Sequence, residues 1–282
     1  MNYLVWILVV LLYAPVFNNL YNIRWDTVDY THAYFILPIS VWLTWRSRHK
    51  LKSNVQKDSS KLCNLLSFSV LVLGGLMFFL GWRQDYVVLQ TFSLIPVLFG
   101  LVGYLYGTSL IKTLSFPILY LLLLVPPPFG ILDSITMPMR YGIAAATELV
   151  LKFASYPITR SGLEMTIGYT TIFMGEPCSG FRSLITMISL VMVYVYISKG
   201  SLLKKIVLSA FIVPMSLVGN LARVITLCLI TFYFGEEAGQ GFFHNFSGIV
   251  IFIITISGIM GLESIIDKMQ SRKEAKELND EK

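Results

Sequence analysis

The sequence predicts an all-α polytopic membrane protein with about eight transmembrane helices, an outer amphipathic helix and a short extracytoplasmic β-hairpin. Of its 282 residues, 55% are apolar and 13% are charged, whereas soluble domains carry about 25% charged residues. The apolar residues also fall in long blocks, and a helix of about 20 apolar residues crosses a hydrocarbon core of about 30 Å. Because lipid offers the backbone no hydrogen-bond partner, such blocks are expected to fold as helices.

Eight apolar segments are expected to span the bilayer, and they lie at 2–18, 28–45, 63–82, 87–106, 109–126, 181–198, 204–234 and 245–266. We expect a single membrane domain over residues 1–282. Within it, residues 127–180 form an outer segment and residues 267–282 form a cytoplasmic tail.

The positive charges orient these segments. Fifteen of the 22 Lys and Arg residues fall in one set of connections, six fall in the opposite set, and Arg223 lies inside the seventh segment. Lys and Arg are enriched in cytoplasmic loops, so both termini are expected to be cytoplasmic and the protein to be integral to the plasma membrane. The formal net charge of +6 follows from these loops, which face lipid headgroups, and we expect no nucleic-acid partner.

The outer segment departs from the apolar pattern. From Leu132 to Phe153, apolar residues that include Leu149 recur at helical spacing, against the charged residues Asp133, Arg140, Glu148 and Lys152. This pattern predicts an amphipathic helix lying in the outer interface. Apolar and polar residues then alternate over 163–167, and Gly168-Tyr169 is a turn signal, so a hairpin is expected. The hairpin leads the chain to Cys178, just before the sixth apolar segment.

Three side chains are expected to meet in the outer leaflet. Cys178 lies at the start of a helix, where the helix dipole favours the thiolate. Arg223 lies within an apolar span, which makes it a candidate functional residue by default. His244 precedes the last span, where the helix N-terminus favours the neutral imidazole, a proton acceptor. The other two cysteines, Cys63 and Cys228, lie in apolar runs and are interpreted as small apolar residues.

Four further residues could support these three. Ser179 and Asn245 are candidate N-caps of the helices that follow Cys178 and His244. Asn220 lies three residues before Arg223, on the same helix face, and could orient the guanidinium. No cofactor or metal is expected, because the cysteines and histidines lack metal-ligand spacing.

Three segments resemble the signature segments of the exosortase and archaeosortase family, and they are Glu-Pro-Cys-Ser-Gly-Phe-Arg-Ser-Leu (176–184), Gly-Asn-Leu-Ala-Arg-Val (219–224) and Phe-His-Asn-Phe-Ser-Gly (243–248). The resemblance implies an eight-helix membrane bundle that acts as a thiol protease and transpeptidase. It implies Cys178 as nucleophile, His244 as acid and base, and Arg223 as the third catalytic residue. Arg182 fits the first segment, four residues after the cysteine and on the same helix face.

The resemblance also implies the substrate: a secreted protein with a C-terminal sorting signal that contains a transmembrane helix. The enzyme would cleave this signal at the outer leaflet and transfer the protein to an acceptor at the cell surface. Three alternatives stay open at this point. They are a membrane cysteine peptidase that only hydrolyses, a small-molecule transporter, and a non-catalytic membrane scaffold.

Overall fold

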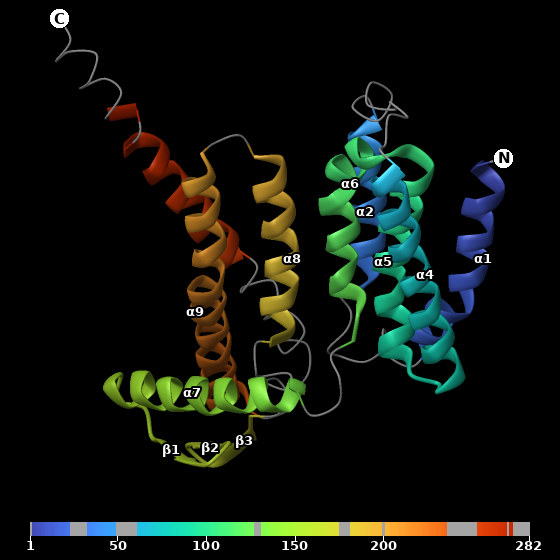
Figure 1. Cartoon of the computed structure of the whole chain (residues 1–282). Coiled ribbons are helices and arrows are strands. Elements are labelled where there is room, and N and C mark those ends of the chain that lie inside the picture. The colour runs from blue at the N-terminus through green and yellow to red at the C-terminus, as the bar shows by residue number, and fades with distance from the viewer. Residues whose placement is uncertain are drawn as a thin grey trace, which may run out of the picture. The chain divides into compact units, whose positions relative to one another are not determined.

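The computed structural model describes residues 2–22, 33–48, 61–126, 131–174, 181–198, 201–235, 253–269 and 271–272. The chain forms two compact units, Met1–Ile131 and Leu132–Lys282. Both are mostly helical, and the second also carries a small sheet (Figure 1). The prediction of a single membrane domain stays a prediction.

The first unit is a helical bundle. Its helices are α1 (Asn2–Leu20), α2 (Ala33–Arg46), α4 (Lys61–Arg83), α5 (Val87–Tyr106) and α6 (Thr108–Tyr120), the last continued by the 3-10 turn η2 (Leu121–Leu124). Helices α4 and α5 form a close antiparallel pair (Figure 1). At Gly100, an added Cβ would lie 2.5 Å from the backbone nitrogen of Leu71, so this approach requires glycine, as is common where membrane helices pack.

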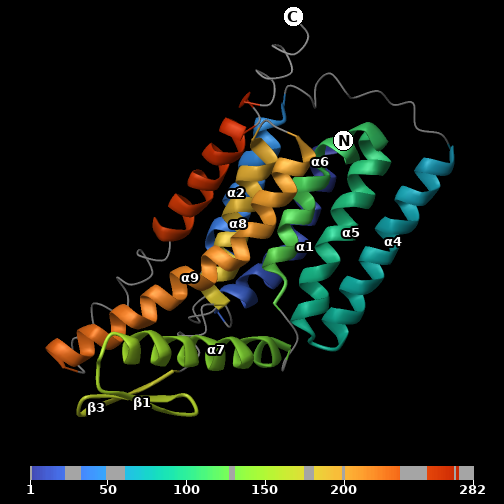
Figure 2. The ribbon, with the colours of Figure 1, turned by 90° about the vertical axis from the view of Figure 1, so that its left-hand side faces the viewer.

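The second unit combines α7 (Ile131–Phe153), β1 (Ile158–Ser161), β2 (Glu164–Ile167), β3 (Thr170–Phe173), α8 (Phe181–Ile197), α9 (Leu202–Phe234) and a helix over residues 253–269. Helix α7 lies across the C-terminal end of α9, and the sheet lies beyond α7 on the side away from α8 (Figures 1 and 2). These elements share one apolar cluster, which we call the α7–sheet core. It contains Ala144, Met165, Met174, Val224 and Leu227, among others.

The predicted hairpin is present, and a third strand extends it. The strands pair antiparallel in the order β1-β2-β3, with Ile158 opposite Ile167 and Met165 opposite Ile172. All four side chains are buried, so the alternation within β2 was correctly predicted. Gly162 and Gly168 begin the two turns with φ of +64° and +59°, the left-handed backbone that two-residue hairpin turns favour.

Helix α7 confirms the predicted helix but buries a different face. The inward stripe contains Thr136, Arg140, Ala144, Thr147 and Leu151, each at most 8% exposed. Arg140, predicted to lie on the polar face, is therefore buried, and one of its guanidinium nitrogens donates to Thr136 Oγ1 at 3.2 Å. Ala144 and Thr147 are small, so α7 can approach the core closely on this side. This close packing determines which face of the helix is buried.

The opposite face of α7 is apolar and exposed. Leu149 and Phe153, which belong to the predicted apolar stripe, are 73% and 93% exposed. Large apolar side chains on a surface helix are typical of contact with lipid or a partner. The burial pattern thus agrees with a helix that lies on a membrane, and the predicted position in the outer interface stays a prediction.

Each predicted span overlaps a described helix, although the second and the eighth begin outside the described residues. Among the residues that the structure describes, four helical segments are long and apolar enough to cross a membrane: Tyr3–Leu20, Lys61–Arg83, Val87–Tyr106 and Leu203–Phe234. Two shorter apolar segments, Thr108–Leu124 and Leu184–Ile197, add to them. These helices indicate an integral membrane protein, whereas the count of eight spans stays a prediction.

Candidate active site

Arg223 is the only charged residue of the sequence between Ile206 and Phe234. It lies on α9, eleven residues before the end of the helix, which corresponds to about 16 Å at 1.5 Å per residue. Its side chain is half-buried. Placing an arginine at the centre of a span costs about 2.5–3.5 kcal/mol on insertion scales, so this position carries a cation in spite of a free-energy cost.

Asn220 lies one turn before Arg223 and is 1% exposed. Residues three apart share a helix face, so the structure brings this amide and the guanidinium to one side of α9. That arrangement was predicted, whereas the orienting role of Asn220 stays a prediction.

The helix around Arg223 is fixed by the α7–sheet core. Val224, the next residue, is 1% exposed and packs in that core together with Met174. Met174 follows β3, is fully buried, and its backbone N–H donates to the carbonyl oxygen of Leu163 at 2.8 Å. Met174 is the last described residue before segment 175–180. It therefore packs in the same cluster as the turn of α9 that carries Arg223.

The remaining predicted site residues are not described. Cys178, Ser179, His244 and Asn245 lie outside the described residues, and Arg182 falls in the first turn of α8 without a described side chain. The distances from Arg223 to the predicted thiol and imidazole therefore stay predictions.

An ionic cluster joins α8, α9 and the helix over 253–269 (the three-helix cluster). Lys204 Nζ lies 2.8 Å from Glu263 Oε1 and 2.7 Å from Asp267 Oδ1, and its side chain is only 5% exposed. Tyr194 of α8 donates its hydroxyl to Glu263. Buried ion pairs are a recognised means of specifying how helices align.

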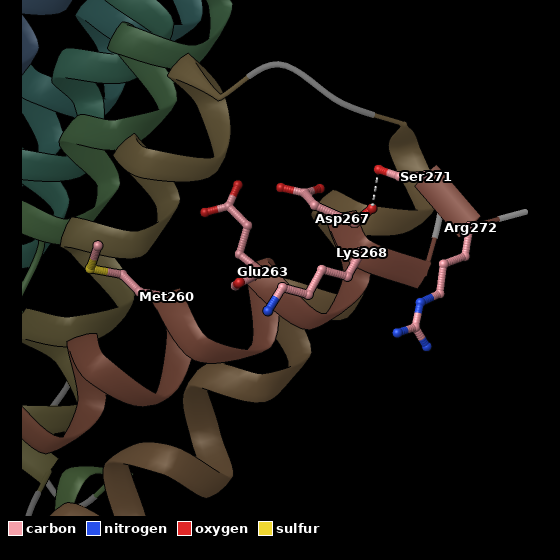
Figure 3. Close-up of a pocket in the computed structure, with 7 residues that line it drawn as sticks. Met260, Glu263, Asp267, Lys268, Ser271 and Arg272 are labelled. Carbon is pink, nitrogen blue, oxygen red and sulfur yellow. Dashed lines mark hydrogen bonds between the residues drawn. The ribbon is translucent and has the colours of Figure 1, made fainter. Parts of the chain in front are cut away.

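The carboxylates of this cluster point to one side of their helix. Figure 3 shows Glu263 and Asp267 on that side and Lys268 and Arg272 extending from the other, with Ser271 donating to the backbone carbonyl of Asp267. The cluster was not predicted from the sequence, because Lys204 and its two carboxylate partners lie far apart in the chain. The sequence feature that could have indicated the cluster is the pair of carboxylates, Glu263 and Asp267, four residues apart in an apolar helix.

Glu148 provides a second charged link, between α7 and the sheet. Its carboxylate accepts from Lys152 at 2.8 Å and from Arg160 of β1 at 3.0 Å. These hydrogen bonds, from Lys152 first and Arg160 second, hold the pKa of Glu148 below its ordinary value. The link therefore forms with an ionised carboxylate.

The other cysteines differ in exposure. Cys228 is 1% exposed within the α7–sheet core, which confirms its interpretation as a small apolar residue, and Cys63 is partly exposed. Within the described residues, no three His, Cys, Asp or Glu side chains group as metal ligands would.

The long apolar helices, with Arg223 within one of them, and the packed α7–sheet core are typical of a membrane protein with a polar residue inside a span. Residues 25–261 match the family model of the transmembrane exosortases. The chain belongs to this family. No curated protein and no solved structure matches it.

Proposed function

We propose that this protein is a membrane cysteine protease and transpeptidase that cleaves the C-terminal sorting signal of secreted proteins. Membership of the transmembrane exosortase family supports the general role. The observation that carries the proposal is Arg223, a cation within an apolar span whose neighbour Val224 packs in the same core as Met174. Cys178 lies four positions after Met174 in the sequence, and a chain of four residues reaches at most about 14 Å.

The chemistry assigns one step to each residue. The Cys178 thiolate attacks the scissile carbonyl carbon, and the carbonyl oxygen gains the negative charge of a tetrahedral intermediate. Arg223 stabilises this oxyanion, a role in which a fixed cation in a water-poor site is effective. His244 gives a proton to the departing amine, so the C–N bond breaks and a thioester remains.

The second half of the reaction releases the thiolate. His244 takes a proton from an acceptor amine or hydroxyl, which attacks the thioester carbon and displaces Cys178. A substrate anchored in the same bilayer by its signal helix brings the scissile bond to the enzyme, which supplies part of the rate through proximity. If water is the nucleophile instead, the same residues carry out hydrolysis.

The test is replacement of the chromosomal gene by Cys178→Ala and by the matched Cys63→Ala. The C-termini of exported proteins that end in a single transmembrane helix are then measured by mass spectrometry. We expect such proteins to keep the helix in Cys178→Ala and to lose it in Cys63→Ala and wild type. The mass at the new C-terminus separates transfer from hydrolysis, and identical C-termini in all three strains would overturn the proposal.

A further inference from the structure

An apolar cavity of about 540 Å³ lies among α1, α2, α5 and α6 in the first unit. Sites for small organic ligands have volumes of about 300–1,000 Å³ and mostly apolar walls. Most of the wall consists of aliphatic side chains, including Leu37, Val41, Leu98, Val102, Leu114 and Ile118. Along α2 the cavity extends from Leu37 to Arg48, about 16 Å of helix.

The hydroxyl groups in the wall donate to backbone carbonyl oxygens. Ser40 Oγ donates to the carbonyl oxygen of Pro117 at 2.9 Å, and Thr44 Oγ1 donates to the carbonyl oxygen of Ser40 at 2.9 Å. A water molecule needs two to four polar partners to occupy a cavity. These walls suit a hydrocarbon chain instead.

One end of the cavity is aromatic and positively charged. The Arg48 guanidinium lies 4.0 Å from the centre of the Trp45 ring, and Trp6, which donates to the Tyr106 hydroxyl at 3.0 Å, completes this end. Among the described residues, no carboxylate forms an ion pair with Arg48. Tryptophan and arginine are enriched where membrane helices meet lipid headgroups.

We infer that this cavity binds one membrane phospholipid with an anionic headgroup. An acyl chain occupies the aliphatic part between Leu37 and Leu114, and the phosphate binds the Arg48 guanidinium at the aromatic end. The occupant is a lipid rather than a free phosphate, because the aliphatic part supplies most of the contact area and the bilayer supplies the chain. The inference does not depend on the proposed function, since none of its residues takes part in that chemistry.

The test compares lipid binding by native mass spectrometry of the full-length protein in detergent. The probes are dioleoyl phosphatidylglycerol, dioleoyl phosphatidylcholine and glycerol phosphate. We expect the wild type to bind phosphatidylglycerol about tenfold more tightly than phosphatidylcholine, and Arg48→Gln to lose this preference, because a charge-assisted hydrogen bond is lost. Arg46→Gln is the matched control. Arg46 stacks on Trp42 at 5.5 Å and does not line the cavity.

A second pair of variants tests the chain-binding part. Leu37→Trp fills the cavity and is expected to lower binding of both lipids, whereas Leu65→Trp places the same side chain at an exposed position of α4. Circular dichroism checks that all variants are folded. An equal loss in Arg48→Gln and Arg46→Gln, binding of glycerol phosphate as tight as that of the lipid, or no effect of Leu37→Trp would each overturn the inference.

Discussion

At the scale of single residues, the proposed enzyme depends on Arg223, the cation expected to stabilise the oxyanion. We expect Arg223→Gln to lower turnover of a sorting substrate by about 10²–10³-fold, because one oxyanion donor is removed. Arg83→Gln, an exposed arginine at the end of α4, is the control and should leave turnover unchanged. Cleavage of a reporter protein with a C-terminal signal helix measures both, and unaltered turnover in Arg223→Gln would exclude the oxyanion role.

Glu148 makes the link between α7 and the sheet sensitive to pH. Because its folded-state pKa is lowered by Lys152 and Arg160, the link contributes stability above the unfolded-state pKa of about 4.3. This contribution is lost as the pH falls through the lower folded-state value. We expect the melting temperature of Glu148→Gln to lie below that of the wild type at pH 6. The difference should disappear as the solution is acidified below pH of about 4, and a constant difference down to pH of about 3 would contradict the assignment.

At the scale of elements, the three-helix cluster ties together the helices that follow the predicted thiol and imidazole. Lys204→Met removes the cation that pairs with the Glu263 carboxylate, while most of the Glu263 side chain stays buried. We expect a loss of about 3 kcal/mol in the free energy of unfolding; the Asp267 pair adds little to this, because that side chain is 53% exposed.

The adjacent Lys205→Met changes the same charge and serves as the control. Thermal unfolding measured by circular dichroism gives the difference between the two variants. Exchanging the charges, with Lys204→Glu and Glu263→Lys together, should recover part of the loss. Equal stability of Lys204→Met and Lys205→Met would show that the cluster does not hold the helices.

Sequence reasoning predicted the helices and strand β2 well, because long apolar blocks, two-residue alternation and a Gly-containing turn are local signals. It missed β1, since four residues without clear alternation carry little information. It also placed Arg140 on the wrong face of α7, because apolar periodicity does not tell which face meets protein and which meets lipid. The small residues Ala144 and Thr147, which allow close packing, decide that point.

The candidate site shows the same limit of prediction from local sequence patterns. Arg223 and Asn220 could be assigned to one helix face from their spacing alone. By contrast, the ion pairs of Lys204 join residues about 60 positions apart, and only tertiary structure brings them together. Hence the placement of Arg223 and Asn220 on one helix could be predicted from the sequence, whereas the cluster formed by Lys204 could not.

At the scale of the whole molecule, the distribution of positive charges predicts that both termini are cytoplasmic. A cysteine introduced at Ser53, between the second and third predicted spans, should react with a membrane-impermeant maleimide only after the cells are permeabilised. A cysteine at Thr166, on the exposed side of the sheet, should react in intact cells. Labelling of both positions in intact cells, or the reverse pattern, would require a different topology.

The most direct test of the central claim is the rate at which Cys178 is alkylated in the purified protein between pH 5 and 9. Mass spectrometry assigns the label, and Cys63, a partly exposed thiol, provides the internal reference. We predict that Cys178 reacts faster than Cys63 near neutral pH, and that His244→Ala shifts the pH profile of Cys178 alone. If Cys178 reacts no faster than Cys63 and its profile does not change in His244→Ala, the protein does not carry an activated catalytic thiol.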